Sequence, residues 1–292
     1  MTDETAVKII ECPRDAMQGI RRFIPTQDKV NYVNALLKVG FDTLDIGSFV
    51  SPTAIPQMSD TALVLSQCEW HQSNTKLLVI SANTRGAREA AMFEQVDFIG
   101  YPFSVSPTFQ KRNTNATQEE ALKTIDEIQN ICIRSGKQLV VYLSMGFGNP
   151  YGDPWNADVV MQWANEMSRR AIGIQSLADT VGMADVTSIS HLFGSMSKEF
   201  PRVELGVHLH TAPHNWKEKV EAAWSAGCRR FDGAIKGFGG CPMAADALVG
   251  NMPTENLVSF LQERKMEPTL DQNALVEALR LADGVFQSVE AY

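Results

Sequence analysis

Three of the five histidines lie close together, in the stretch GVHLHTAPH (206–214). Side chains two residues apart on a strand point to the same side, so His208 and His210 would present both imidazoles to one surface. Such a pair can bind a metal, act as a general base, or simply form the polar end of a strand. Taken alone, it favours the last interpretation. His214 is expected in a loop or first helical turn, in a capping or surface role.

Short runs rich in apolar residues alternate with helical periods along the chain. The predicted strands cover 7–11, 43–47, 76–81, 95–100, 138–144, 172–178, 204–210 and 229–235. Apolar residues fill most of each run, which is typical of strands covered on both faces, as in a parallel sheet. Eight strands, each followed by a helix or loop, indicate an α/β fold of the (β/α)8 TIM barrel type. An open doubly wound sheet is the alternative, but no G-x-G-x-x-G follows the first strand.

Local signals mark where the helices between the strands begin and end. Thr26 is a candidate cap for a helix that ends at Gly40. Thr117 and Glu120 match a capping box for a second helix, which Gly136 would end.

Two more helical segments complete the expected organisation. A helix near 215–226 falls between the last two strands, and a helix near 268–289 lies beyond the barrel. We expect a single catalytic barrel domain over 1–292, with 268–292 as a C-terminal helical extension.

Polar residues that follow the first and last strands are candidates for chemistry, because the active site of such a barrel lies at the C-terminal ends of its strands. Arg14 and Asp15 follow the first strand, where a surface ion pair is the competing interpretation. A loop with glycines at 237, 239 and 240 follows the eighth strand and carries Cys241, with Asn251 further on. A turn with an inert thiol is the alternative there.

Topology brings these candidates together. In a closed barrel the eighth strand lies between the seventh and the first, so one sector of the rim would hold Asp15, His208, His210, Cys241 and Asn251. Two imidazoles, a carboxylate and an amide oxygen form a mixed oxygen and nitrogen set. That set fits Mg²⁺ or Mn²⁺, and fits Zn²⁺ less well, since zinc sites favour thiolate and closed tetrahedral geometry. Clustering makes metal binding the favoured interpretation of the histidine pair.

Composition narrows the classes of partner and compartment. The formal net charge is −8 and no long Lys/Arg run occurs, which argues against nucleic-acid binding. Five widely spaced cysteines without a CxxC pair suit a reducing compartment. The N-terminus is acidic where a signal peptide would be basic, and no apolar run reaches the length of a membrane span. We expect a cytoplasmic protein with no membrane partner.

Seven segments, in order along nearly the whole chain, resemble 3-hydroxy-3-methylglutaryl-CoA lyase. They are PRDAMQ (13–18), GSFVSPTAIPQMSD (47–60), GNPYG (148–152), SLADTVG (176–182), GVHLH (206–210), GFGGCP (237–242) and GNMPTENLV (250–258). Related lyases and Claisen-condensing synthases share the barrel and the histidine pair, but SFVSP and GGCP point to the lyase branch. The resemblance implies a homodimer built with help from the C-terminal helices. It also implies retro-Claisen cleavage of a 3-hydroxyacyl-CoA to acetyl-CoA and a keto acid, which is acetoacetate for the family substrate.

The resemblance also implies roles for individual residues. A divalent metal, Mg²⁺ or Mn²⁺, would be held by Asp15, His208, His210 and Asn251. The expected catalytic residues are Arg14, Asp15, Asp45, His208 and Cys241. Arg14 would stabilise the enolate oxygen. Cys241 would protonate the enolate or move protons with His208. The expected substrate-binding residues are Arg14, Gln18, Ser48, Tyr151 and Asp179.

Four positions depart from the family pattern. Thr211 stands where an acidic residue usually follows the histidine pair, and Asp45 stands near a position that is usually Glu. Cys12 replaces a glycine before the proline, and Ala16 replaces a glycine after the aspartate. These changes leave two alternatives open: a lyase for another 3-hydroxyacyl-CoA or hydroxy acid, and an inactive barrel that binds an acyl-CoA.

Overall fold

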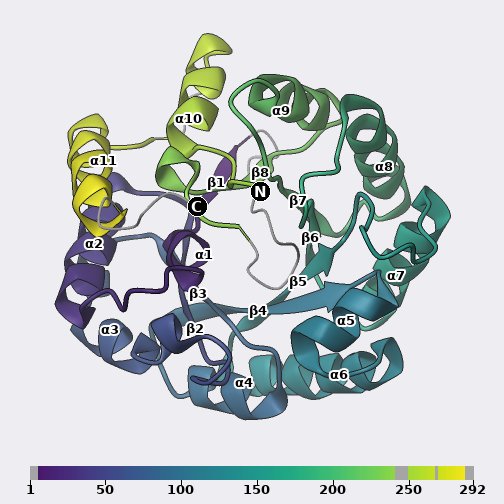
Figure 1. Ribbon diagram of the computed structural model, residues 1–292, viewed down its shortest axis with the longest axis horizontal. Helices are drawn as coiled ribbons and strands as arrows, with labels where there is room; N and C mark the ends of the chain where they lie inside the picture. Colours follow the sequence, from purple (N-terminus) through teal and green to yellow (C-terminus); the bar gives the residue numbers. More distant parts are fainter. Residues whose placement is uncertain (1–5, 241–248, 267–268, 287–292) are drawn as a thin grey trace.

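Eight parallel strands close into a barrel in the computed structural model, which describes residues 6–240, 249–266 and 269–286 (Figure 1). The strands are β1 Lys8–Glu11, β2 Thr43–Ser48, β3 Lys76–Ile80, β4 Val96–Ser104, β5 Gln138–Ser144, β6 Ile174–Ala178, β7 Glu204–His208 and β8 Arg230–Gly233. They follow chain order around the barrel, and β1 pairs with both β2 and β8. The predicted (β/α)8 fold is confirmed.

The helices lie mostly around the strands, where they cover the outer face of the barrel, whereas α1 lies inside this ring in the view of Figure 1. They are α1 Pro13–Gln18, α2 Thr26–Val39, α3 Thr61–Gln67, α4 Thr84–Ala91, α5 Pro107–Thr114, α6 Gln118–Ser135, α7 Ala157–Arg169, α8 Val186–Glu199, α9 Trp216–Ser225, α10 Thr254–Glu263 and α11 Gln272–Phe286. Short 3-10 turns are η1 Pro56–Met58, η2 Trp70–Gln72 and η3 Ile235–Gly237. The expected helix beyond the barrel is present as α11, which lies beside α2, where the rings of Phe286 and Tyr32 meet edge to face.

The local helix signals are mostly confirmed. The capping box at Thr117 and Glu120 is formed, and Gly40 and Gly136 end their helices in the left-handed conformation. The expected cap at Thr26 is wrong. Pro25 precedes the helix instead, and Thr26 is its first residue, with a hydroxyl that donates to Asp60.

The side chains that point into the barrel divide into two halves of different character. We call one the apolar half, a cluster separate from the outer core that comprises Leu78, Ile80, Phe98, Val140, Tyr142 and Ile174 from β3 to β6. We call the other the polar half, which comprises Cys12, Asp45, His208, Arg230 and Asp232 from the remaining sector. Alternation along each strand sends these residues inward and their neighbours outward to the helices.

Arg230 closes the N-terminal end of the polar half. Its aliphatic stem crosses Gly206 on β7, where an added Cβ would lie only 2.9 Å from Arg230 Cδ. The guanidinium reaches Glu204 at 3.2 Å, and Lys8 binds the same carboxylate at 2.6 Å. A larger residue at 206 would therefore displace the arginine, so glycine is required by close packing.

Candidate active site

The turn into α1 places three polar side chains at the C-terminal rim directly after β1. Pro13 begins the helix, which suits its fixed φ and missing N–H. Arg14 Nε and Nη2 both donate to Asp45 on β2, the Nε at 3.0 Å to Oδ2, as a bidentate pair. Arg14 Nη1 donates to Asp15 Oδ1 and to Gln18 Oε1, each at 2.8 Å. These bonds fix the guanidinium and leave one Nη2 N–H without a partner among the described residues.

Asp15, His208 and His210 form a candidate metal-binding group, with one ligand atom from each lying within 4.8 Å of the others. Asn251 joins them, since its Nδ2 donates to Asp15 Oδ2 at 2.8 Å and to the Phe238 carbonyl at 2.8 Å. Its Oδ1 is buried and has no partner in the described part of the chain. A buried amide oxygen left in this way beside a carboxylate and two imidazoles fits a divalent cation. The structure thus brings together all four expected ligands.

The histidine pair is held by both β7 and the segment before α10. The strand ends at His208, two residues earlier than predicted, and His210 instead forms an antiparallel bridge with Asn251. The Thr211 N–H donates to the Gly250 carbonyl at 2.8 Å. The two imidazole rings lie 5.3 Å apart. His214 is exposed in the turn before α9, away from this group.

Charge and burial shift the pKa values of these groups in different directions. Burial acts to raise the pKa of Asp15, but Arg14 and the two histidines outweigh it and lower the value to about 2. Burial and the neighbouring His208 lower the pKa of His210 to about 3, so this ring is neutral and available as a ligand. Burial acts to lower the pKa of His208, but the carboxylates of Asp232 and Asp15 raise it. Burial raises the pKa of Asp45 to about 6, although Arg14 opposes this effect.

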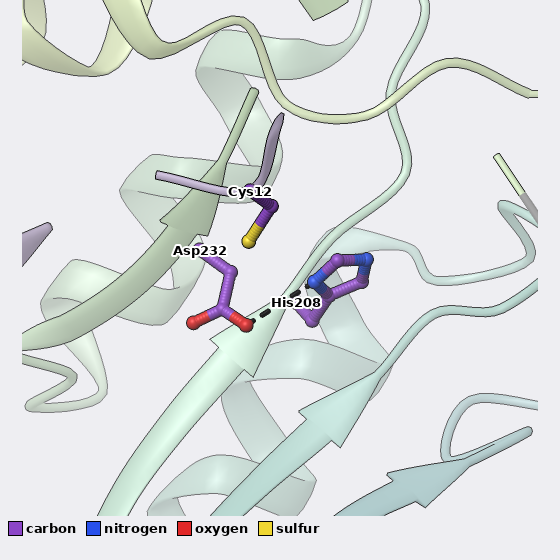
Figure 2. Close-up of side chains that lie close together, drawn as sticks. All are labelled: Cys12, His208 and Asp232. Atoms are coloured by element: carbon purple, nitrogen blue, oxygen red, sulfur yellow. Dashed lines mark hydrogen bonds and ion pairs between the residues drawn. The ribbon is translucent and has the colours of Figure 1, made fainter. Parts of the chain in front are cut away.

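Asp232 on β8 is a functional candidate that the sequence interpretation missed. Its Oδ2 lies 3.2 Å from His208 Nδ1, and the side chain is fully buried (Figure 2). A carboxylate on Nδ1 fixes the ring so that Nε2 faces the rim, an arrangement found behind many metal-bound histidines. An acidic residue within a predicted strand, two positions after Arg230, was the signal available in the sequence.

Lys219 on α9 is a second residue that was missed, and it explains the surroundings of Asp179. Its Nζ donates to Asp179 Oδ2 and to the His210 carbonyl, each at 2.8 Å. The Ala184 N–H donates to the other carboxylate oxygen of Asp179. Asp179 therefore supports the backbone of the histidine pair in this structure, and its expected substrate contact stays a prediction.

The remaining expected residues lie at different distances from the group. Gln18 contacts both Arg14 and Asp15, with Nε2 donating to Asp15 Oδ1 at 2.7 Å. Ser48 is buried at the end of β2. Tyr151 lies beside α5, stacked on Phe109 and beneath the Arg112 guanidinium.

The glycine-rich loop after β8 approaches the site closely. Gly239 has a φ of +95°, and an added Cβ would lie 2.5 Å from the Asp15 carbonyl oxygen. Phe238 before it stacks on Phe286 of α11 with ring centroids 4.4 Å apart, and Lys236 pairs with Asp283. Cys241, expected on this loop, lies outside the described residues.

Among the helices of the described residues, none has the length and apolar character of a membrane span.

Fold and site together define a TIM barrel with a candidate metal centre at the rim where such barrels carry their active sites. The family described as HMGL-like matches residues 6–282, and the chain belongs to it. The cytoplasmic 3-hydroxy-3-methylglutaryl-CoA lyase of Rattus norvegicus is 28% identical over 93% of this chain and 79% of its own length. The 3-hydroxy-3-isohexenylglutaryl-CoA/hydroxymethylglutaryl-CoA lyase of Pseudomonas aeruginosa is also 28% identical, over 93% of this chain and 90% of its own.

A solved structure of a lyase has the same fold. The HMG-CoA lyase of A. baumannii in complex with coenzyme A and 3-methylmalate superposes with a TM-score of 0.89 at 27% identity, covering 98% of this chain and 92% of its own. Membership of a lyase family is therefore shown by the sequence and the fold together.

Proposed function

We propose that the protein is a divalent-metal-dependent lyase that cleaves 3-hydroxy-3-methylglutaryl-CoA to acetyl-CoA and acetoacetate. The observation that carries this proposal is the grouping of Asp15, His208, His210 and the unpartnered Asn251 oxygen beside Arg14. The names of the relatives support it, and the coenzyme A in the neighbouring structure supports a thioester substrate.

Asp15, His208, His210 and Asn251 would hold the metal, for which we propose Mg²⁺ or Mn²⁺. When bound, such an ion supplies Lewis acidity that makes a 3-hydroxyl group easier to deprotonate and orients the substrate. The histidines can serve as ligands because the lowered pKa keeps His210 neutral, and because a hydrogen bond from His208 Nδ1–H to Asp232 would leave Nε2 free to bind the metal.

We assign Arg14 the role of stabilising the negative charge that develops on the thioester oxygen. Cleavage of the C2–C3 bond places electrons on the thioester oxygen, and a fixed guanidinium N–H stabilises that charge without reorganisation. Asp45 and Gln18 hold the Arg14 guanidinium in place. Cys241 is proposed to protonate the enolate carbon, on the resemblance of GFGGCP to the family loop.

A second substrate is favoured by Thr211 and by one relative. Thr211 is buried, and its hydroxyl lies 3.4 Å from the Asn251 carbonyl at the position where an acid usually follows the histidine pair. The Pseudomonas aeruginosa relative is named for an isohexenyl as well as a methyl substituent. The alternative substrate is therefore a 3-hydroxyglutaryl-CoA with a larger 3-substituent.

The decisive experiment is a product assay with metal-free protein to which Mg²⁺ or Mn²⁺ is returned. We expect acetyl-CoA and acetoacetate with metal, and none with chelator. His208→Ala should abolish release, whereas His214→Ala is the matched control, since that histidine is exposed in a turn. Metal binding without product would contradict this substrate assignment, and a panel of 3-substituted thioesters would then be assayed.

The alternative of an inactive acyl-CoA-binding barrel is tested by calorimetric titration with Mn²⁺. Equal Mn²⁺ affinity in wild type and His208→Ala would contradict the metal site itself.

We also propose a single catalytic domain over 1–292, a homodimer and a cytoplasmic location. Sedimentation at several protein concentrations tests the dimer. The relatives include cytoplasmic and mitochondrial lyases, so fractionation of cells tests the location.

A further inference from the structure

A second group of metal-ligating atoms lies next to the rim site, deeper in the barrel. Cys12 Sγ, a His208 ring nitrogen and an Asp232 carboxylate oxygen all lie within 4.8 Å of one another. Figure 2 shows the thiol of Cys12 pointing towards the space between Asp232 and His208, with a dashed line joining the Asp232 carboxylate to the His208 ring. Cys12 and Asp232 are only 1% and 2% exposed, so water does not solvate them freely.

One polar atom of this group lacks a hydrogen-bond partner. Asp232 Oδ1 is buried and has no hydrogen-bond partner among the described residues. The thiol contacts the Ile10 carbonyl at 3.6 Å, and it is surrounded by the carboxylates of Asp232, Asp45 and Asp15. Arg230 interacts electrostatically with Asp232, but it makes no hydrogen bond to Asp232 Oδ1 in the described part of the chain, and a buried acceptor left without a partner is costly.

We propose that Cys12, His208 and Asp232 form a binding site for a thiophilic divalent ion, with Zn²⁺ as its ligand. One thiolate, one imidazole and one carboxylate are the donor types that zinc accepts, whereas Mg²⁺ does not take sulfur ligands. The thiol releases its proton to solvent on binding. The rim group next to it has no sulfur ligand and suits a harder ion.

His208 cannot serve both ions in its neutral form, because a neutral imidazole has a single nitrogen with a free lone pair. With an ion at the rim, Nε2 is the ligand and Nδ1–H donates to Asp232, 3.2 Å away. With Zn²⁺ on Nδ1, the proton moves to Nε2, which faces Asp15 Oδ2 at 3.9 Å. Zinc therefore removes a ligand from the rim site and opposes Mg²⁺ or Mn²⁺ there. This antagonism rests on the proposed function, but zinc binding does not.

Cobalt spectroscopy tests the site directly, since Co²⁺ replaces Zn²⁺ and a cobalt–thiolate bond has a charge-transfer band in the near ultraviolet. We expect the band in wild type and in Cys241→Ala, and its loss in Cys12→Ala. Cys132→Ala removes a buried thiol on α6 and is the matched control that should keep the band. Absence of the band in wild type, or its loss in Cys241→Ala with retention in Cys12→Ala, would overturn the proposal.

Competition between Zn²⁺ and Mn²⁺ tests whether the two sites share His208. We expect one equivalent of Zn²⁺ to weaken Mn²⁺ binding by more than about tenfold in wild type and not in Cys12→Ala. Independent binding of both ions would refute the antagonism while leaving the zinc site in place. A protein that shows the cobalt band but cleaves no thioester would disprove the proposed function alone.

Discussion

The two halves of the barrel interior are built from the same kind of strand but serve different ends. The apolar half packs six large side chains, of which only Tyr142 carries a polar atom, a buried hydroxyl without a partner in the described part of the chain. The polar half buries two carboxylates, an arginine and a thiol, beside a histidine whose side chain is 12% exposed. Burial of charge costs free energy unless pairing and hydrogen bonds offset it, whereas burial of apolar surface is favourable. The difference predicts that, of these two halves, the apolar half contributes more to stability and the polar half more to the proposed chemistry.

The first way to break this comparison is Phe98→Ala in the apolar half. Loss of a buried ring and the resulting cavity should lower the free energy of unfolding by about 3–5 kcal/mol. Urea unfolding measures this loss, and kcat/KM per folded molecule should stay close to wild type. Phe98→Leu is the control, with a smaller loss. A large loss of kcat/KM with unchanged stability would show that the apolar half takes part in chemistry.

Asp15→Asn at the rim should have the opposite effect, a large loss of kcat/KM with a small loss of stability. The amide keeps the size of the side chain but removes the charge that faces Arg14 and the metal site, so kcat/KM should fall by about 10²–10³-fold. The stability loss should not exceed about 2 kcal/mol, because the lowered pKa of Asp15 sets the scale of its favourable interactions. Asp28→Asn on α2, where the residue is exposed, is the matched control for both measurements.

Glu11 tests whether a buried carboxylate near the polar half acts on stability alone. It accepts hydrogen bonds from Thr254 Oγ1 at 2.5 Å and from the Ile235 N–H at 3.0 Å. Burial raises its pKa from 4.5 to about 8. The folded state therefore holds the proton more tightly than the unfolded state, so stability is fully present below pH 4.5 and declines as pH rises to about 8.

Glu11→Gln should remove this decline. The expected gain over wild type at pH 9 is on the order of 2–4 kcal/mol, with little difference at pH 4. Urea unfolding across this pH range measures it, and Glu218→Gln at an exposed position of α9 is the control. Parallel pH curves for wild type and Glu11→Gln would contradict the assignment.

Asp232→Asn sharpens the comparison within the polar half itself. The amide keeps the shape but loses the charge that orients His208, so Mn²⁺ affinity should fall roughly 10–100-fold. Calorimetric titration measures the affinity, and the control is Asp153→Asn, far along the chain in the loop before α7. An unchanged affinity would mean that His208 needs no support from Asp232.

The sequence was sufficient for the barrel and for the grouping of Asp15, His208, His210 and Asn251. Hydrophobic runs located all eight strands, and the order of strands in a closed barrel then fixed which polar residues share a sector. Strand ends were less accurate, because β7 ends where His210 turns to pair with Asn251, a contact between distant segments. Thr26 was misassigned because its hydroxyl bonds Asp60 on another element.

Residues that support the site were the ones missed. Lys219 lies on a helix with many charged neighbours, and nothing local distinguishes it from a surface lysine. Its role depends on Asp179 and the His210 carbonyl, which only packing brings within 2.8 Å. Asp232 was included in a predicted strand, but its contact with His208 depends on the side-chain direction and the register between β7 and β8. Supporting contacts of this kind are set by three-dimensional geometry and leave a weak trace in a single sequence.

The arginine that crosses Gly206 also has a kinetic consequence. With Arg230, Glu204 and Lys8 joined across the N-terminal strand ends, the polar half is closed on that side. If the chain is the lyase proposed above, the substrate would enter by the rim and both fragments would leave by the same opening. The fragment nearer the opening would then have to leave before the deeper one.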